Sequence, residues 1–289
     1  MPAQSDAAPP PEENPITLTL WPFWDVSIGP NGVSKPEPLS GVTVCVVKKR
    51  HYAQAWEQFV DTRGPCQEDV PAGNKVVLKG VPALSELVLT AEKDGFVPRA
   101  IPVTTGQWDE DMTGDTDIQQ MHMFSKESAQ TVFPGADFTK GQISVYVISV
   151  GVAVPDASTL PTFILFVPGG VSLALEPPVG DGPFYFYDGV VRDGATSTLP
   201  AAFPGSFAVF TNLPGNEYAV RLSENALANT AATTAHWAFG FRDERTNVIR
   251  APVLPGHYTA VAFSGTSCKL YSDDSQTSCA TSSSDGGAP

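Results

Sequence analysis

Prolines and glycines recur along almost the whole chain, and no other feature limits its fold as strongly. The 289 residues include 27 prolines and 25 glycines, roughly 18% of the chain where about 12% is usual. Because a proline inside a helix or a central strand breaks it, this distribution argues against a helical bundle and against a doubly wound α/β fold. Hydrophobic residues still make up 42%, which is enough for a packed core and excludes a wholly disordered chain.

Short segments with alternating apolar and polar residues lie between these turns. Such alternation is typical of strands with one buried face. The segments with this pattern are 16–20, 41–46, 75–78, 87–91, 141–148, 171–175, 184–187, 206–210, 218–222, 236–241, 246–250 and 257–263. Only Tyr52 to Val60 is predicted to form a short helix, because Trp56 and Phe59 would share one face. Short strands with Gly/Pro turns between them predict an all-β protein built from sandwiches.

Three segments repeat the same order of a strand, a tight Pro/Gly turn and a second strand. They cover 76–89, 207–220 and 247–261. Proline sets φ at such a turn and glycine accepts a positive φ, so each segment is interpreted as a hairpin. The leucine or aromatic residue after the turn is expected to return to the core.

One of these repeats resembles a known pattern. Residues 205–220, GSFAVFTNLPGNEYAV, look like the G-x-F-x-F-x-N-L-P-x-G-x-Y-x-V segment of carboxypeptidase regulatory-like domains, and residues 41–98 are similar to the same pattern. The resemblance implies transthyretin-like sandwiches that serve as extracellular adjuncts of enzymes, receptors or surface lipoproteins and share no catalytic residues. The fold is therefore predicted to be all-β, with two tandem transthyretin-like/Ig-like antiparallel β-sandwich domains.

The chain is predicted to divide into five parts. They are a disordered Pro/Ala-rich linker (1–15), a first β-sandwich domain (16–106), an acidic connecting segment (107–140), a second β-sandwich domain (141–271) and a low-complexity tail (272–289). The linker lacks the basic start and apolar core of a signal peptide, and it is typical of a segment behind a removed signal or a lipid-bearing cysteine. The natural chain is therefore expected to begin upstream of Met1.

Four cysteines fall into two close pairs, Cys45 with Cys66 and Cys268 with Cys279. Four cysteines allow three pairings, and the local pairing is favoured because it keeps each disulfide within one region. The spacing does not fit a zinc site. An even number of cysteines in an acidic, β-rich chain favours disulfides and an oxidising compartment, namely the periplasm, the cell surface or the medium. Four free thiols in a cytosolic protein are the alternative.

Charge and motifs exclude several functions. The chain carries 31 acidic and 17 basic side chains, with a formal net charge of −14. This argues against a nucleic-acid partner, because phosphates require a basic surface. The sequence contains no run of 18 apolar residues, so no transmembrane segment is predicted. The four histidines are scattered, and no nucleophile or phosphate-binding motif occurs, so no catalytic residue is predicted.

An acidic segment supplies the candidate cation ligands. Asp109, Asp111, Asp115 and Asp117 carry the hard oxygen atoms that calcium prefers. Their spacing does not match an EF-hand, and a solvated linker is the favoured interpretation. No cofactor is therefore expected, with calcium as the alternative.

Met121, His122 and Met123 form a second candidate metal site. Thioether and imidazole groups suit Cu(I). In a strand, however, His122 points away from both methionines, so the three could not converge without an outside ligand or a bulge. The alternative is two core methionines beside Phe124.

Aromatic residues occupy both faces of two predicted strands. They include Trp21 and Trp24 near the start, and Tyr185 and Tyr187 in the second half. Because a half-exposed strand buries only alternate residues, some of these rings are expected in a second interface or on the surface. Exposed rings could stack on sugar rings or dock a protein, and packing between the domains is the alternative.

Three hypotheses for the function follow. The first is a non-catalytic extracytoplasmic binding or structural module of a bacterial cell envelope. It would bind a protein partner, and one version of this hypothesis is a lipoprotein. The second is a carbohydrate-binding module that meets a cell-surface glycan through exposed aromatic side chains. The third is a metal-binding protein or metal-dependent enzyme that uses residues 109–123.

Overall fold

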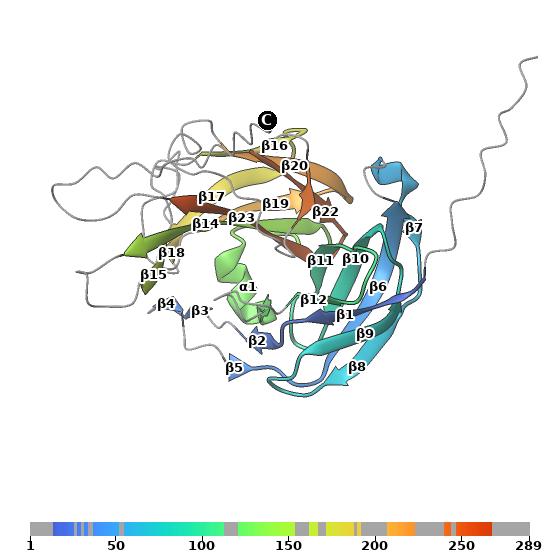
Figure 1. The fold of residues 1–289 in the computed structure, drawn as a ribbon. Coiled ribbons are helices and arrows are strands. Elements are labelled where there is room, and N and C mark those ends of the chain that lie inside the picture. Colours follow the sequence, from blue (N-terminus) through green and yellow to red (C-terminus); the bar gives the residue numbers. More distant parts are fainter. Residues whose placement is uncertain are drawn as a thin grey trace, which may run out of the picture.

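The computed structural model describes most of the chain, and the regular secondary structure of the described part is almost entirely strand (Figure 1). The described residues are 14–25, 28–29, 32–33, 37–51, 55–112, 121–153, 162–166, 172–187, 190–191, 207–222, 240–243 and 247–267. The prediction of an all-β fold is confirmed. Within these ranges, no helix is long and apolar enough to cross a membrane.

Strands of the first half form two layers around one core. One layer is β11-β10-β6, with β7 and β8 both paired to β6, and the other contains the sheets β12-β1-β9 and β13-β2-β5. Both layers contribute to a cluster that includes Leu18, Val44 and Leu87. The strands are β1 (Ile16–Leu20), β2 (Phe23–Asp25), β5 (Glu37–Pro38), β6 (Val42–His51), β7 (Val60–Asp61), β8 (Cys66–Val70), β9 (Val76–Val81), β10 (Ser85–Glu92), β11 (Arg99–Thr104), β12 (Glu110–Asp111) and β13 (Met121–Met123), beside a small separate pair, β3 (Ile28–Gly29) and β4 (Gly32–Val33).

Strands of the second half form another sandwich. The larger layer is β18-β17-β19-β14-β23, with β15 paired to β14, and the smaller layer is β16-β20-β22-β21. Their facing sides share a core that includes Val145, Phe210 and Tyr218. The strands are β14 (Gly141–Ala153), β15 (Thr162–Phe166), β16 (Leu173–Glu176), β17 (Asp181–Tyr187), β18 (Val190–Val191), β19 (Phe207–Leu213), β20 (Asn216–Leu222), β21 (Phe241–Arg242), β22 (Val248–Val253) and β23 (Tyr258–Ser267).

The two halves are joined edge to edge. Arg99 and Ala100 of β11 pair in parallel with Tyr258 and Thr259 of β23, so a single 11-stranded sheet runs through both halves (Figure 1). Parallel pairing also joins β14 with β23, β1 with β12, and β2 with β13. The remaining pairs are antiparallel, as predicted. Parallel pairs occur where a long crossover separates the strands, because a tight turn can connect only antiparallel neighbours.

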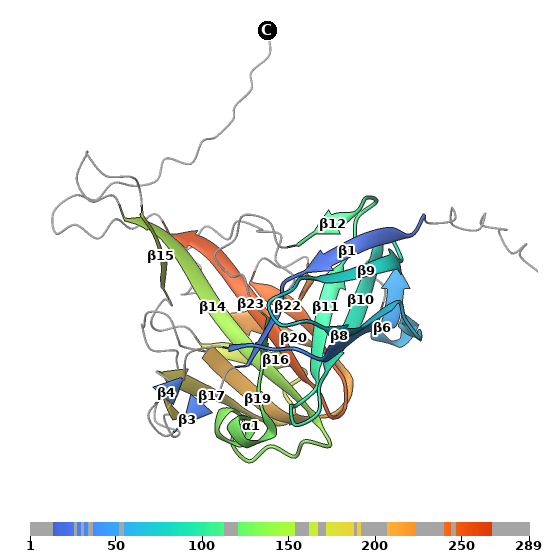
Figure 2. The same cartoon turned by 90° about the horizontal axis from the view of Figure 1, so that it is seen from below.

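A helix that the sequence analysis did not predict lies beneath this junction. It is α1 (Lys126–Val132), and it starts where the Ser125 Oγ accepts a hydrogen bond from the Ser128 N–H at 3.1 Å. Its buried Ala129 and Val132 belong to a cluster with residues of β19 and β23. Figure 2 shows α1 against the large sheet of the second half. Residues 107–140 thus contribute β12, β13 and α1 to the fold in addition to connecting the two halves.

The prediction of three hairpins is wrong. In each repeat the two strands belong to different sheets, as β9 and β10, β19 and β20, and β22 and β23 do. Each turn therefore carries the chain across a sandwich, from one layer to the other. The buried residues on either side of a turn then face each other through the core, as Leu213 and Tyr218 do. The Tyr218 hydroxyl also donates a hydrogen bond to the Pro214 carbonyl at 3.0 Å, which closes that turn.

The asparagine of the N-L-P-x-G segment has a structural role. Asn212 lies at a φ of 62°, a left-handed conformation that asparagine tolerates better than most residues. Its side-chain amide donates to the Gly135 carbonyl at 3.1 Å and to Asp181 Oδ2 at 2.6 Å, and its Oδ1 accepts from the Asp137 N–H at 2.7 Å. Asn212 thus fixes the segment after α1 to the end of β19.

The helix predicted over Tyr52 to Val60 is reduced to one 3₁₀ turn, η1 (Trp56–Gln58). Val60 already belongs to β7, and residues 52–54 lie outside the described ranges. One turn is enough to bring the rings of Trp56 and Phe59 to 5.2 Å from each other and to place Phe59 5.8 Å from Phe241 of the second half.

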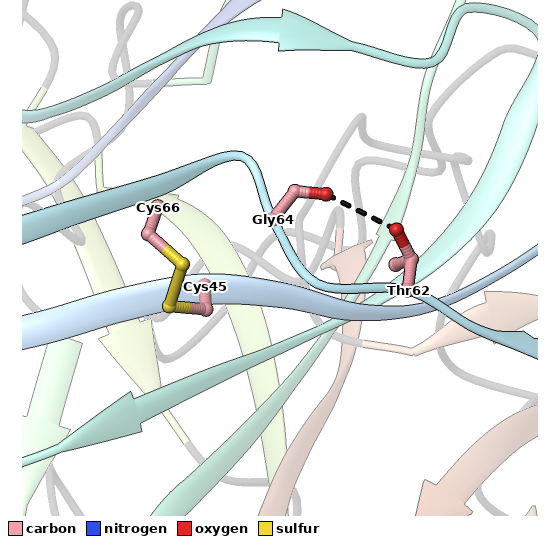
Figure 3. Close-up of a disulfide and its surroundings, with 4 residues drawn as sticks. All are labelled: Cys45, Thr62, Gly64 and Cys66. Atoms are coloured by element: carbon pink, nitrogen blue, oxygen red, sulfur yellow. Dashed lines mark hydrogen bonds between the residues drawn. A yellow bond between two sulfur atoms is a disulfide. The ribbon is translucent and has the colours of Figure 1, made fainter.

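Cys45 and Cys66 form a disulfide between β6 and β8, as predicted (Figure 3). They lie directly opposite each other in the register of the two strands, with a Cα–Cα distance of 4.1 Å. The chain between them turns back at Gly64, whose carbonyl accepts a hydrogen bond from the Thr62 hydroxyl at 3.2 Å. Cys268 and Cys279 lie outside the described residues, so their pairing stays a prediction.

Protein isolated without reductant is therefore expected to take up no alkylating reagent at Cys45 or Cys66. The measurement is the intact mass before and after alkylation, followed by a peptide map that recovers the linked Cys45–Cys66 pair. Full reduction before alkylation is the control, and it should expose both thiols. Labelling of both cysteines without reductant would contradict the disulfide.

Candidate functional site

Two of the four candidate sugar-binding rings are core residues. Trp21 is 2% exposed in the first core, and Tyr185 is 4% exposed in the second. The Tyr185 hydroxyl accepts a hydrogen bond from the Leu173 N–H at 3.0 Å, which satisfies its polar end inside the core. Their expected exposure is therefore corrected, since neither ring can stack on a ligand in solution. Trp24 is half-buried in β2, and the Tyr187 side chain lies outside the described part of the structure.

Of the candidate calcium ligands, Asp109 directly precedes β12 and Asp111 is its last residue, opposite Thr19 of β1. Asp109 Oδ1 accepts a hydrogen bond from the Thr17 N–H at 2.6 Å, and Asp111 Oδ2 lies 3.2 Å from Lys75 Nζ. Asp115 and Asp117 lie outside the described ranges. Among the residues that are described, no three or more His, Cys, Asp or Glu side chains converge as metal ligands do. Calcium binding stays a prediction.

Met121, His122 and Met123 form β13, and they alternate as expected for a strand. Both methionines are fully buried in the first core. His122 faces the other way, toward Arg99. The structure therefore does not bring the three side chains together as a copper site would require.

His122 lies at the junction of the two halves. Its carbonyl oxygen accepts a hydrogen bond from Arg99 Nη1 at 2.8 Å and another from the Tyr258 hydroxyl. Burial of its imidazole and, secondly, the positive charge of Arg99 lower its pKa from 6.5 to about 4. Burial likewise raises the pKa of the Tyr258 and Tyr146 hydroxyls, so both stay neutral at physiological pH. His122, Tyr146 and Tyr258 are thus uncharged at this junction, and Arg99 carries its positive charge.

Four charged side chains meet between the two sandwiches, and we call them the ionic tetrad. Arg50 of β6 and Glu86 of β10 come from the first half, while Glu217 of β20 and Arg250 of β22 come from the second. Leu87 and Leu89 of β10 face the first core, so Glu86 lies on the opposite side of the sheet, which faces the second half. The side chains of the tetrad are 0% (Arg50), 5% (Glu86), 12% (Glu217) and 17% (Arg250) exposed.

Each carboxylate of the tetrad contacts both arginines. Glu86 Oε2 accepts from Arg50 Nε at 2.6 Å, and Glu86 Oε1 accepts from Arg250 Nη2. Glu217 accepts from Arg250 Nη1 at 3.2 Å and from Arg50 Nη2. Burial alone would lower the pKa of Arg250, but hydrogen bonds and charges of the two glutamates outweigh it and raise that pKa. Two positive and two negative charges thus balance within the interface.

Two aromatic side chains pack against the arginines of the ionic tetrad. The Arg50 guanidinium carbon lies 4.1 Å from the ring centre of Phe59 and 5.4 Å from that of Phe241, and Arg250 lies 5.7 Å from the Phe241 ring. Phe59 comes from the first half and Phe241 from the second. Cation–π contacts of this kind are stronger when water is excluded. The arrangement fixes the orientation of the two sandwiches with both apolar and charged contacts.

Trp108 is an exposed aromatic residue that the sequence analysis did not single out. It is 78% exposed, in the loop between β11 and β12. The loop is held at both ends, since the Leu84 N–H donates to the Gly106 carbonyl at 3.0 Å and the Thr17 N–H donates to Asp109 Oδ1 at 2.6 Å. A tryptophan between Gln107 and Asp109, in a segment without strand alternation, was the available signal.

No family model matches the chain, and no curated protein matches it. Solved structures with a detectable likeness include the minor pilin GBS52 of Streptococcus agalactiae, with 11% identity, a TM-score of 0.23, and coverage of 90% of this chain and 100% of that one. The major pilin of Streptococcus pyogenes has 10% identity, a TM-score of 0.23, and coverage of 89% and 100%. The Bacillus anthracis TIE protein has 9% identity, a TM-score of 0.18, and coverage of 88% and 35%. Likeness at this level carries no inference about fold or function.

Proposed function

We propose that the protein is a non-catalytic extracytoplasmic module of a bacterial cell envelope, with a structural or binding role. The observation that carries this proposal is the buried ionic tetrad of Arg50, Glu86, Glu217 and Arg250 between two sandwiches that share one sheet. A binding module or a structural spacer benefits from such fixed orientation, because its surfaces are then presented at constant distance and angle.

The disulfide supports the extracytoplasmic part of the proposal. Cys45–Cys66 joins directly opposed residues of β6 and β8, and disulfides persist in oxidising compartments. The resemblance of residues 205–220 to carboxypeptidase regulatory-like domains supports the same location, and we propose that the two sandwiches are transthyretin-like domains of this kind. The Pro/Ala-rich start fits a lipoprotein in which the linker separates the first sandwich from the membrane.

Carbohydrate binding is the second candidate function, and a specific observation favours it. Trp108, at 78% exposure on an anchored loop, supplies the exposed ring that Trp21 and Tyr185 do not. Tryptophan at such a position presents a large apolar face to solvent, which is typical of binding surfaces.

Cell fractionation tests the proposed location. Native cells are expected to hold the protein in envelope or surface fractions, with Cys45–Cys66 oxidised, and to yield a discrete cross-linked complex after treatment with a lysine-reactive cross-linker. The measurements are immunoblots of the fractions, protease accessibility on intact cells, and mass spectrometry of the cross-linked band. Recovery in the cytosolic fraction with free thiols would contradict the proposal. A cytosolic marker enzyme is the control for leakage.

A further inference from the structure

In the second half, the strand through which the chain enters lies beside the strand through which it leaves. β14 opens this half and β23 closes it, and they pair in parallel over ten consecutive residues, from Gln142 opposite Tyr258 to Gly151 opposite Ser267. Figure 2 shows the two strands side by side and pointing the same way. Because the strands are parallel, the start of β14 and the end of β23 lie at opposite ends of the pair.

Tension applied at these two ends acts lengthwise on the pair. The start of β14 is pulled backward while the end of β23 is pulled forward, so the strands are displaced past each other. The hydrogen bonds of a parallel pair are evenly spaced, and under lengthwise displacement they carry the load together. A pair that is pulled apart at one end opens bond by bond, because only the bond nearest that end carries load. The same pair therefore resists lengthwise tension better than opening from one end.

The first half repeats this arrangement. β1 and β2 open it, and β12 and β13 are its last strands before α1. β1 pairs in parallel with β12, where Leu18 lies opposite Glu110, and β2 pairs in parallel with β13, where Phe23 lies opposite Met121. In each half, then, the first strands of the described chain and the last ones are parallel neighbours.

Contacts at the junction resist separation of the two halves under tension. β23 is bonded to a strand of each half, because Arg99 and Ala100 of β11 pair in parallel with its start. The Tyr258 N–H donates to the Pro98 carbonyl at 3.0 Å, and the Tyr258 hydroxyl donates to the His122 carbonyl. The buried ionic tetrad also links β6 and β10 to β20 and β22. Both halves thus hold the start of β23, while the chain continues from its end.

We propose that the protein bears tension between its two chain ends, as a load-carrying connector with an attachment on each side. In Figures 1 and 2, β1 begins on the right of the molecule and β23 ends on the left. A force between the chain ends therefore has a lengthwise component on β14 and β23. This inference rests on the structural role proposed above and specifies it.

Single-molecule pulling of the full chain in two geometries tests the proposal. Handles at position 140 and at the C-terminus load β14 and β23 lengthwise, whereas handles at positions 140 and 255 pull the pair apart at one end. Lys140 and Pro255 are exposed and lie at the same end, where the Gly256 N–H donates to the Lys140 carbonyl at 3.1 Å. Clickable amino acids at these positions carry the handles. At equal pulling speed, the lengthwise geometry is expected to need a roughly twofold or higher unfolding force, because forced unfolding depends on the unfolding rate.

Pulling between the two termini should show the same high force for the second half. Unfolding of residues 141–267 lengthens the tether by roughly 400 Å, which identifies this event. Unfolding of the first half is identified by reductant, which opens Cys45–Cys66 and lengthens that step by about 70 Å.

A stability control separates the pulling geometry from damage by the labels. Both labelled proteins should keep the urea midpoint of the natural chain, since the labels replace exposed side chains. The proposal is overturned if the two geometries unfold at equal force, or if pulling between the termini unfolds the second half at the lower force of the opening geometry. Either result leaves the cell-fractionation test of location unaffected, and recovery in the cytosol would leave the ratio of the two forces unchanged.

Discussion

Replacement of Glu86 by glutamine is expected to lower the free energy of unfolding by about 3 to 5 kcal/mol. Glu86 is 5% exposed and accepts hydrogen bonds from both Arg50 and Arg250. The variant leaves two buried guanidinium groups opposite the single carboxylate of Glu217. A buried charge without compensation costs several kcal/mol, whereas the balanced tetrad costs far less. Chemical denaturation followed by circular dichroism measures the change.

The double variant Arg50→Met/Glu86→Gln is expected to be more stable than the sum of its single variants predicts. It removes one charge of each sign and leaves Arg250 paired with Glu217 at 3.2 Å. The methionine also retains an apolar contact with Phe59, where the Arg50 guanidinium lies 4.1 Å from the ring. A double-mutant cycle with all four proteins yields the coupling energy, expected to be about 1 to 3 kcal/mol.

An exposed ion pair is the matched control for the tetrad. Lys48 and Asp61 lie 2.6 Å from each other on β6 and β7, but the Asp61 side chain is 85% exposed. Asp61→Asn should leave the denaturation midpoint nearly unchanged, because solvent screens exposed pairs. Strictly additive effects in the Arg50/Glu86 cycle, or equal losses for Glu86→Gln and Asp61→Asn, would contradict the role of the tetrad.

Much of the architecture could be predicted from local patterns. Alternation identified strands such as Ile16–Leu20, whose burial alternates along its length, and the excess of glycine and proline excluded helical folds. The local pairing of Cys45 with Cys66 followed from proximity in the chain. Each of these features depends on neighbouring residues, so a single sequence contains the necessary information.

The pairing between strands could not be predicted in the same way. A strand–turn–strand pattern is equally consistent with a hairpin and with a turn that crosses between sheets, because both return apolar residues to a core. A signal for the junction was nevertheless present. Leu87, Val88 and Leu89 are consecutive apolar residues, which is typical of a strand buried on both faces, and Val88 packs against the second half. Glu86 lies beside this run, but its partners Glu217 and Arg250 are far away in the chain.

The candidate aromatic residues show the same difference between features that local patterns explain and features that they do not. Rings in or beside strands, such as Tyr185 in β17 and Trp21 directly after β1, are buried because a strand of a two-layer sandwich directs its largest apolar groups into the core. The exposed ring, Trp108, lies in a loop, where strand alternation does not predict which side chains are buried. Position on a loop between polar residues was therefore a better indicator of exposure than aromatic density.

The free energy of unfolding is expected to fall by about 3 kcal/mol as the pH decreases from 6.5 to 4, and His122 is the expected cause. Burial and the Arg99 guanidinium lower the pKa of His122 to about 4 in the folded protein, against 6.5 in the unfolded chain. Between these two values the unfolded chain binds a proton that the folded protein does not. Acid therefore favours unfolding over this range, and the effect is complete once the pH falls below about 4.

His122→Gln should remove this dependence between pH 6.5 and 4, because glutamine has no proton to bind. The two tyrosines at this junction, Tyr146 and Tyr258, stay uncharged in this range, since burial raises the pKa of both. His51→Gln, at an exposed position at the end of β6, is the matched control and should keep the full dependence. Urea denaturation at intervals of half a pH unit measures the slope for each protein. If His122→Gln loses stability toward acid as steeply as the natural chain, the proton binds at another group, and His122 is not the cause of the pH dependence.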